Sequence, residues 1–404
     1  MVTYPKDWKE KTFNAFLKIK RGASPRPIES YLTSNIGGVN WIKIGDAPRY
    51  GKYITSTEEK ITTMGAAHSV RVFPGDFILS NSMSFGRPYI LSIDGCIHDG
   101  WLRLYDFQAE ADDEFLYYLL SSSYVQRQYE SFAAGSGVQN LNKEVVKNVV
   151  VCIPSLTEQK KIAQTLSSFD TYINDLDELI KKKRGIRDGA LEDLTCQRTR
   201  MAGFTGEWME YAISDITRTI IIGGTPSTAC QEYYGGNIPW LSSTEIHQKR
   251  IKTPTTYITD LGLQNSSAKM APEGSVLIAL AGQGKTRGTA AYLTRPMALN
   301  QSLAALITNE KCNPEFLYYL IERMYLPLRD LSSGDGGRGG LNKKLIKGIF
   351  VTIPVDVAEQ KAIADALTAM DEEIEALENE RDKMIQIREG AMDDLLTGRI
   401  RLKA

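Results

Sequence analysis

The chain contains two copies of one sequence unit. Short segments of the first half recur in the same order in the second half, at an offset close to 200 residues. Glu114–Leu119 matches Glu315–Leu320, and Leu141–Lys143 matches Leu341–Lys343. The other matched pairs are Asp7-Trp8 with Glu207-Trp208, Asn40–Ile42 with Pro239–Leu241, and Ile153-Pro154 with Ile353-Pro354. Chance does not produce such an ordered series, so a fold of two related units is predicted.

The first part of each copy, residues 1–154 and 201–354, is rich in glycine, proline, aromatic residues and short apolar runs. Such composition predicts short strands joined by turns. One helix is expected around Phe115–Tyr129, with a counterpart at Phe316–Leu328. We therefore expect each first part to be a compact α+β domain.

The second part of each copy, residues 155–200 and 355–404, is helical in pattern and carries an apolar seam with spacings of four and three. The seam positions are Ile162, Leu166, Phe169, Ile173, Leu176 and Ile180, then Lys183, Arg187, Ala190 and Leu194 in the first copy. In the second copy they are Ile363, Leu367, Met370, Ile374 and Leu377, then Arg381, Met384, Arg388, Ala391 and Leu395. A single helix cannot bury such a stripe, so the two helices are predicted to pair as a coiled coil.

Antiparallel pairing is the expected arrangement. Parallel helices would crowd both globular domains at one end, whereas antiparallel helices relate the two copies by a pseudo-twofold axis. About 34 helical residues at ~1.5 Å each give a rod of roughly 50 Å. The predicted fold is thus two α+β domains separated by an antiparallel coiled coil of two long helices.

Arg187, Arg381 and Arg388 fall on or beside the seam, where a charge is costly unless it is paired. The structural interpretation is that they form ion pairs with neighbouring acids or extend outward to solvent. The functional alternative is that they fix the register of the helices or contact a partner subunit. Both interpretations remain open from the sequence.

The formal net charge is −1, but the charge is unevenly distributed. Residues 359–394 carry 12 acidic and 4 basic side chains, so the rest of the chain is modestly basic, which is compatible with contact to phosphates. The five cysteines are scattered and never form a C-x-x-C pair, which favours reduced thiols in a cytoplasm over disulfides or a zinc site. The three histidines lack metal-ligand spacing, and neither a signal peptide nor a membrane span is expected.

Two segments imitate enzyme motifs. Ala279–Thr286 fits a relaxed phosphate-loop pattern, but a strand-like segment follows where that motif requires a helix. Asn313–Phe316 resembles the adenine-gripping loop of amino-methyltransferases, but no glycine-rich cofactor loop precedes it. We interpret it as a helix start, with Asn313 as the cap and Pro314 at the first position.

Duplicated motifs at the ends of the two helices carry a family resemblance. Ile153–Lys160 and Ile353–Lys361 open the helices with an Ile-Pro…Glu-Gln-Lys pattern. Arg187–Leu194 and Arg388–Leu395 close them, and Gly203–Trp208 and Leu396–Arg401 are in the same style. In this order, over essentially the whole chain, they resemble the specificity (S) subunit of type I restriction–modification systems.

The resemblance implies two target-recognition domains, each reading one half of a gapped, asymmetric site in double-stranded DNA. The paired helices would act as a spacer and dock two methylation subunits, which transfer methyl groups from S-adenosylmethionine to adenine. Two restriction subunits would complete the endonuclease. The chain itself would carry neither catalytic residues nor a cofactor.

Candidate DNA-binding residues lie on the loops that are most expected to be exposed. Glycine-rich loops allow close backbone approach, Lys and Arg neutralise phosphates, and Asn and Gln can pair with adenine. The candidates in the first domain are Asn81, Ser82, Ser84, Arg87, Ser136, Gln139, Asn140, Asn142 and Lys143. Those in the second domain are Gln283, Lys285, Arg287, Arg338, Asn342 and Lys343. The alternative for each is a solvated hairpin loop.

Other conspicuous residues have simpler explanations. Trp41 and Trp240 are expected to pack in the core instead of stacking on bases, and Lys181–Arg184 is expected to be a solvated helix face, with phosphate contact as the alternative. The recognition loops differ between the copies, so different half-sites are predicted. Two rival functions remain: an enzyme, which the missing motifs disfavour, and a coiled-coil adaptor whose end domains bind proteins. Salt-sensitive DNA binding would separate the adaptor from a DNA-binding protein.

Overall fold

The computed structural model describes residues 4–48, 51–81, 86–134, 141–282, 285–331 and 340–402. The chain divides into two compact units, and each is described by itself. Unit 1 comprises residues 1–177 and 379–404, and unit 2 comprises residues 178–378. Each unit therefore contains one globular domain together with half of each long helix.

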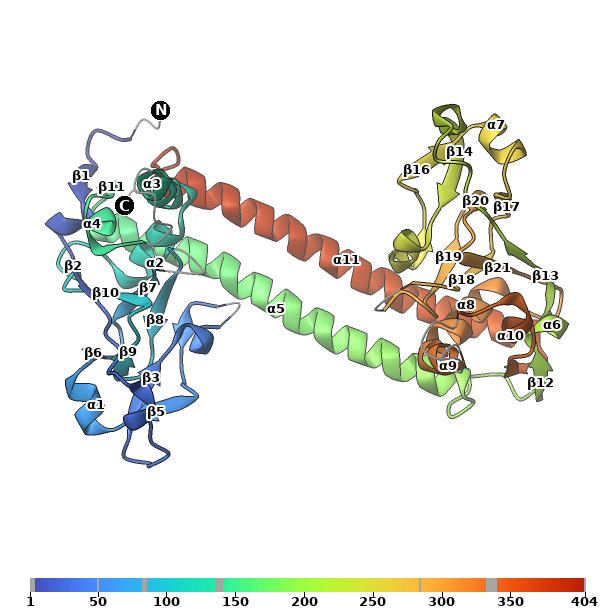
Figure 1. The fold of residues 1–404 in the computed structure, drawn as a ribbon, viewed down its shortest axis with the longest axis horizontal. Helices are drawn as coiled ribbons and strands as arrows, with labels where there is room; N and C mark the ends of the chain where they lie inside the picture. Colours follow the sequence, from blue (N-terminus) through green and yellow to red (C-terminus); the bar gives the residue numbers. More distant parts are fainter. Residues whose placement is uncertain are drawn as a thin grey trace. The chain divides into compact units, whose positions relative to one another are not determined.

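Unit 1 contains a mixed α+β domain (Figure 1). Its strands are β1 (Lys9–Thr12), β2 (Lys18–Arg21), β3 (Val39–Ile42), β4 (Tyr53–Ile54), β5 (Glu59–Ile61), β6 (Val70–Val72), β7 (Phe77–Ser80), β8 (Pro88–Leu91), β9 (Gly95–Ile97), β10 (Trp101–Tyr105) and β11 (Val150–Ile153). Its helices are α1 (Thr63–Ala67), α2 (Asp113–Ser121), α3 (Ser123–Ala134), α4 (Lys143–Lys147) and the first half of α5 (Leu156–Thr195).

Unit 2 repeats this set of elements. Its strands are β12 (Trp208–Ala212), β13 (Thr217–Ile222), β14 (Tyr234–Leu241), β15 (Arg250–Ile251), β16 (Thr256–Ile258), β17 (Lys269–Ala271), β18 (Val276–Ala279), β19 (Ala290–Leu293), β20 (Met297–Leu299), β21 (Leu303–Thr308) and β22 (Phe350–Pro354). Its helices are α6 (Ile213–Ile216), α7 (Asp260–Gln264), α8 (Pro314–Arg323), α9 (Tyr325–Leu331), α10 (Lys343–Lys347) and the first half of α11 (Val357–Leu396). Short 3-10 turns connect several of these elements in both units, among them η5 (Ser243–Gln248).

The sheets of the two units have the same topology. A five-stranded sheet runs in the order β2-β10-β7-β8-β4 in unit 1 and β13-β21-β18-β19-β15 in unit 2. A four-stranded sheet runs β5-β3-β9-β6 and β16-β14-β20-β17, and the pairs β1-β11 and β12-β22 close the base of each domain. The predicted internal repeat is therefore confirmed strand by strand.

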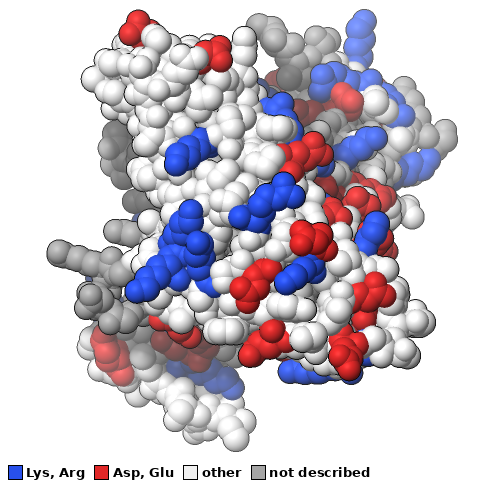
Figure 2. All heavy atoms as spheres, turned by 90° about the vertical axis from the view of Figure 1, so that its right-hand side faces the viewer, with Lys and Arg blue, Asp and Glu red and all other residues white. Residues whose placement is uncertain are grey.

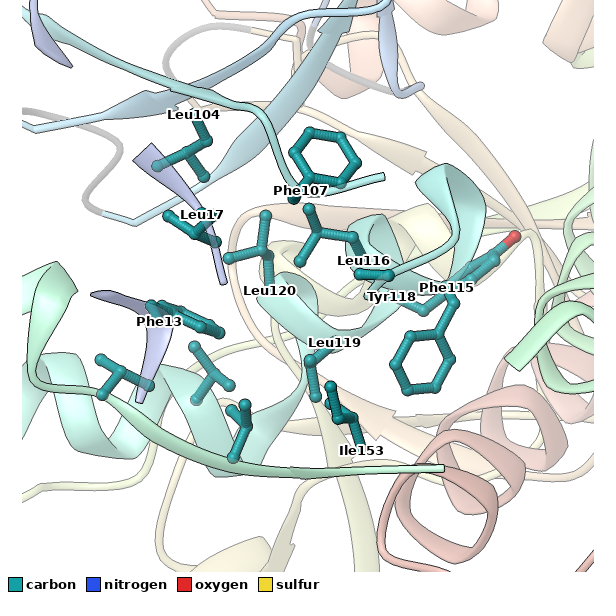
Figure 3. Packing of buried hydrophobic residues seen from close by; sticks show 14 of the residues in the cluster. Phe13, Leu17, Leu104, Phe107, Phe115, Leu116, Tyr118, Leu119, Leu120 and Ile153 are labelled. Atoms are coloured by element: carbon teal, nitrogen blue, oxygen red, sulfur yellow. The ribbon is translucent and has the colours of Figure 1, made fainter. Parts of the chain in front are cut away.

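The core of the domain in unit 1 lies between the five-stranded sheet and α2. Figure 3 shows Leu116 and Leu120 of α2 directed toward Phe107 and Leu104, and all four side chains are fully buried. Each large side chain of this kind that leaves water contributes roughly 1.5–3 kcal/mol to folding. Tyr118 turns away from this cluster, with its hydroxyl oxygen at the edge of the group.

The single helix that we predicted after the sheet is wrong in one respect, because each unit has two helices there. In unit 1 the break falls at Ser122, whose φ/ψ of −67°/146° is extended. The Ser122 hydroxyl accepts a hydrogen bond from the amide of Val125 at 3.3 Å and so caps α3. In unit 2 the break falls at Met324, between α8 and α9.

The two long helices pair in an antiparallel sense within each unit. In unit 1, Ile162 and Leu166 from the start of α5 share a core with Met392 and Leu395 from the end of α11. In unit 2, Leu191 and Leu194 from the end of α5 share a core with Ile363 and Leu367 from the start of α11. The predicted antiparallel pairing of the two long helices and the internal repeat are confirmed. None of the described helices is long and apolar enough to cross a membrane.

Candidate nucleic-acid interface

Two of the predicted loops meet at one edge of each domain. In unit 1 the loop after β7 and the segment before α4 are joined by a hydrogen bond from the Leu141 amide to the Asn81 carbonyl, at 3.0 Å. In unit 2 the Leu341 amide donates to the Leu280 carbonyl, also at 3.0 Å. The structure therefore brings each pair of candidate segments together, at equivalent places in the two domains.

The side chain of Asn81 has a structural role. It is 6% exposed, and its amide nitrogen donates to the carbonyl of Asp99 at 2.9 Å. Our expectation that Asn81 is exposed is therefore wrong, because the fold uses its amide to hold the neighbouring turn. Contact between Asn81 and DNA remains a prediction that the structure does not test.

Asn142 and Asn342 act as helix caps. The side-chain oxygen of Asn142 accepts from the amide of Val145 at 2.9 Å, and that of Asn342 accepts from the amide of Leu345 at 3.0 Å. Each cap satisfies an amide that would otherwise lack a partner and fixes the direction of α4 or α10. Both asparagines are exposed, so the amide group of each side chain still reaches solvent.

The basic candidates that the structure describes lie around these segments. Lys143, Lys285 and Lys343 are exposed, whereas Arg87 and Arg287 are half-buried. The guanidinium of Arg87 lies over the ring of Tyr89, at 5.2 Å from its centroid. Seven further candidates lie outside the described residues: Ser82, Ser84, Ser136, Gln139, Asn140, Gln283 and Arg338.

Sequence reasoning missed two lysines of this edge. Lys344 and Lys347 follow Lys343 in α10, and all three are exposed. The signal was available, because α10 reads Lys-Lys-Leu-Ile-Lys where α4 reads Lys-Glu-Val-Val-Lys. On the side of unit 2 that faces the viewer in Figure 2, basic and acidic side chains are interspersed, and several Lys or Arg side chains lie next to one another.

A tyrosine–aspartate–arginine group with a fully buried tyrosine fastens each domain to the long helices. In unit 1 the Tyr118 hydroxyl donates to Asp170 of α5 at 2.6 Å. Arg388 of α11 lies 2.5 Å from the same carboxylate. Burial, with the hydrogen bond to Asp170, raises the pKa of Tyr118 well above its ordinary value, so the hydroxyl is a proton donor at neutral pH.

Unit 2 has the equivalent group. The Tyr319 hydroxyl donates to Asp371 at 2.9 Å, and the Arg187 Nε lies 2.9 Å from that carboxylate. Arg187 also donates to Glu322 of α8 and is only 4% exposed. Burial raises the pKa of Tyr319 to about 12.

The ion pairs that we expected for the seam arginines are confirmed. Arg187 and Arg388 are paired as described above, and Arg381 lies 3.3 Å from Asp177 and 2.7 Å from Asp382. A role of these arginines in fixing the register or contacting a partner subunit stays a prediction.

The segments that imitate enzyme motifs have structural roles. The next element described after β18, which ends at Ala279, is strand β19, whereas a phosphate loop is followed by a helix. Asn313 caps α8 by accepting from the Phe316 amide at 3.0 Å, with Pro314 in the first turn, as predicted. Trp41 and Trp240 are 1% and 8% exposed and belong to the core.

The sequence also raises expectations about metal ligands and thiols. Among the residues that the structure describes, no group of three or more His, Cys, Asp and Glu side chains is placed to hold a metal ion. All five cysteines are free thiols.

Lys181 and Lys182 are exposed on α5, while Lys183 pairs with Glu373 at 2.6 Å and Arg184 pairs with Glu378.

Comparison with protein families gives two matches to one family model. The model described as the type I restriction modification DNA specificity domain matches residues 5–184 and 205–386. Each match contains one globular domain and most of the long helix that follows it.

Individual relatives agree with this match. The MjaVIII type I restriction enzyme specificity subunit of Methanocaldococcus jannaschii is 23% identical over 99% of this chain and 94% of its own length. The HindI specificity subunit of Haemophilus influenzae is 27% identical over 48% of this chain and 42% of its own length.

Solved structures share the fold. A type I restriction–modification S subunit from M. genitalium is 17% identical, with a TM-score of 0.60 over 96% of both chains. A chain from a structural study of complex assembly and conformational transition in a type I system is 17% identical, with a TM-score of 0.64 over 98% of this chain and 100% of that chain.

Proposed function

Because the chain belongs to the family of type I restriction–modification specificity subunits, we propose that it reads a bipartite, gapped site in double-stranded DNA and positions partner subunits there. Each globular domain contacts one half of the site, and the bases between the two halves are not read. The methylation and restriction subunits supply the chemistry, and S-adenosylmethionine binds to the methylation subunit. On this proposal the chain acts as a non-catalytic subunit in the cytoplasm.

The observation that carries the proposal is the repeated edge at which the two predicted loops meet in each domain. Both domains place a hairpin loop beside a capped short helix, through the same 3.0 Å backbone hydrogen bond. The framework of the edge is repeated, but the loop sequences differ, from Asn81–Arg87 in unit 1 to Leu280–Arg287 in unit 2. A constant framework with variable loops suits two domains that read different base sequences.

The roles at this edge divide by chemistry. Exposed lysines such as Lys143 and Lys343 neutralise phosphates, which gives affinity without sequence preference. The polar loop side chains face the base edges and give specificity. The amide of Asn81 also supports the framework of the edge, because it is buried and bonded to the carbonyl of Asp99.

The long helices provide the spacer and the docking surface for two methylation subunits. Two restriction subunits join the assembly to form the endonuclease. The domains are fastened to the helices by the groups around Asp170 and Asp371, so a domain cannot rotate freely on its helix without breaking these contacts. A fixed domain orientation is what a constant spacing between two half-sites requires.

The test is an adenine-methylation map of DNA from cells that express this chain together with the methylation subunit of the same system. We expect a split motif of two defined blocks around several unspecified bases, with one methyladenine on each strand. The two blocks should differ in sequence, because the recognition loops differ. A palindromic motif would contradict the prediction of different half-sites.

A matched control uses the methylation subunit without this chain, which should add no methylation. No added methylation from a well-formed complex would instead support the adaptor function, in which the domains bind proteins. Tight binding of S-adenosylmethionine to the isolated chain would support the enzyme alternative.

A further inference from the structure

The short helices α4 and α10 occupy the same place in the two domains but differ in charge. Asn142 and Asn342 cap them through hydrogen bonds of 2.9 and 3.0 Å. Val146 and Ile346 anchor them, since both side chains are fully buried. With the backbone position fixed in this way, the exposed residues can be compared one to one.

In α4 one lysine is neutralised by the helix itself. Glu144 accepts an ion pair from Lys147 at 2.9 Å, so the three charged residues of α4 leave a net charge of +1. In α10 the position of Glu144 is occupied by Lys344. The net charge of α10 is therefore +3, and none of its lysines is ion-paired with a carboxylate in the described part of the chain.

A second contrast lies beside the adjacent hairpin. In unit 2, Arg329 of α9 donates to the Tyr325 hydroxyl at 2.8 Å, and that hydroxyl donates to the carbonyl of Lys285 at 2.9 Å. A cation is thereby tied to the hairpin loop. In unit 1, helix α3 contacts its hairpin loop through a neutral donor, because the Gln126 amide donates to the carbonyl of Gly86 at 2.9 Å.

We propose that the domain of unit 2 supplies the larger share of the phosphate contacts, through Lys343, Lys344 and Lys347 of α10. The proposal rests on the proposed function, because it assumes that this edge faces DNA. Unit 1 holds its DNA half-site with fewer ionic contacts and relies more on uncharged side chains. The two domains should therefore contribute unequally to the salt dependence of DNA binding. Each neutralised phosphate adds ~0.9 to the magnitude of the negative slope of log affinity against log salt concentration.

The experiment exchanges the charge at one pair of equivalent positions. The complex with the methylation subunits is prepared as wild type, Lys344→Glu and Glu144→Lys. Lys269→Glu is the control, because Lys269 is exposed on β17 and gives the same change of charge. Affinity for a duplex of about 30 base pairs and arbitrary sequence is measured by fluorescence anisotropy at a series of KCl concentrations, which reports phosphate neutralisation.

Lys344→Glu should make the salt dependence weaker, reducing the magnitude of the slope by about 1–2. It removes one cation and gives Lys347 a carboxylate partner within α10, as in α4. Glu144→Lys should raise the slope by about 1–2 for the opposite reason. Lys269→Glu should leave the slope within error of wild type. The milder Lys344→Gln should lower the slope by about 1, and it replaces Lys344→Glu if that variant fails to fold.

Equal slopes for Lys344→Glu and Lys269→Glu, in a complex that binds DNA in a salt-dependent way, would overturn the inference and leave the proposed function intact. The same applies if Glu144→Lys does not raise the slope. If the wild-type complex does not bind DNA at low salt, the proposed function fails, and the inference fails with it.

Discussion

The two junctions between a domain and the long helices use the same contacts but bury charge to different extents. Tyr118, Asp170 and Arg388 form the group in unit 1, and residues about 200 positions away form it in unit 2. The arginine of unit 1, Arg388, is 23% exposed and pairs with one carboxylate. The arginine of unit 2, Arg187, is 4% exposed.

The difference comes from one substitution on the helix that faces the arginine. Arg187 has a second carboxylate partner in Glu322, whereas the matching position in unit 1 is Ser121. A guanidinium that is fully removed from water requires compensation for its lost hydration, and a second carboxylate supplies it. The geometry of the junction is therefore the same in both units. The amount of buried charge is larger in unit 2, and the free-energy cost of breaking the junction is larger there too.

The largest effect is expected for Arg187→Leu. It would remove the buried guanidinium that Asp371 and Glu322 share and leave them only the exposed Lys249, whose ammonium lies 3.9 and 3.5 Å from their carboxylates. Breaking this buried pair should therefore cost about 3 kcal/mol. Arg388→Leu should cost about 1–2 kcal/mol, because Asp170 keeps the Tyr118 hydrogen bond and is partly exposed. Hydrogen–deuterium exchange, followed peptide by peptide, measures the loss in the free energy of unfolding separately for unit 1 and unit 2.

Arg381→Leu is the control for this pair of variants. Its main partners, Asp177 and Asp382, are 52% and 60% exposed, so the loss should be below about 1 kcal/mol. Equal losses for Arg187→Leu and Arg388→Leu would contradict the comparison. Unchanged assembly of both variants with the methylation subunit would exclude a role of these arginines in docking it.

The features that the sequence predicts correctly are those with a local signal. The seam of the long helices follows from apolar spacing, and Leu166, Leu176 and Ile180 are indeed buried. The cap at Asn313 follows from an Asn-Pro pair at a helix start. Such features need only neighbouring residues, so a single chain is enough to find them.

The features that the sequence does not predict depend on residues far apart in the chain. The partner of Arg187 is Glu322, which lies on a different element, and no local pattern points to it. The break at Ser122 is missed because its hydroxyl competes with the backbone for an amide in the middle of an apolar pattern. Asn81 was expected to be exposed, but the turn at Asp99 folds back onto it and buries its amide.

A second prediction concerns contacts that are the same in both units. Gln159 is fully buried, accepts from the Asp112 amide at 2.8 Å and donates to the Glu110 carbonyl at 2.8 Å. Gln360 is also fully buried and makes the equivalent pair of contacts in unit 2, with the Asn313 amide and the Lys311 carbonyl, at 2.7 and 2.9 Å.

Gln159→Ala and Gln360→Ala should therefore destabilise their units equally, each by about 2 kcal/mol, because each leaves buried backbone groups without partners. The measurement is again exchange by peptide, with the opposite unit as the internal control. A difference of more than about 1 kcal/mol between the two variants would show that the framework is less symmetric than its contacts indicate.

A smaller effect than that of the glutamine variants is expected at the start of α5 in unit 1, and it depends on pH. Arg401 donates to both oxygens of Glu158, at 2.6 and 2.7 Å, and these hydrogen bonds lower the pKa of the Glu158 carboxyl below its ordinary value of 4.5. A carboxyl whose pKa is lower in the folded than in the unfolded state adds stability above the unfolded pKa, and loses it as the pH falls through the folded pKa.

Arg401→Met should thus destabilise unit 1 by about 1 kcal/mol at pH 7, and the difference from wild type should shrink below pH 4.5. Unfolding by urea at pH 7 and at pH 3.5 measures this change, and amides of unit 2 that exchange at unchanged rates at pH 7 serve as the control. A difference that stays constant between the two pH values would mean that Arg401 stabilises unit 1 through packing on Trp8, whose ring lies 5.6 Å from its guanidinium, and not through the charge of Glu158.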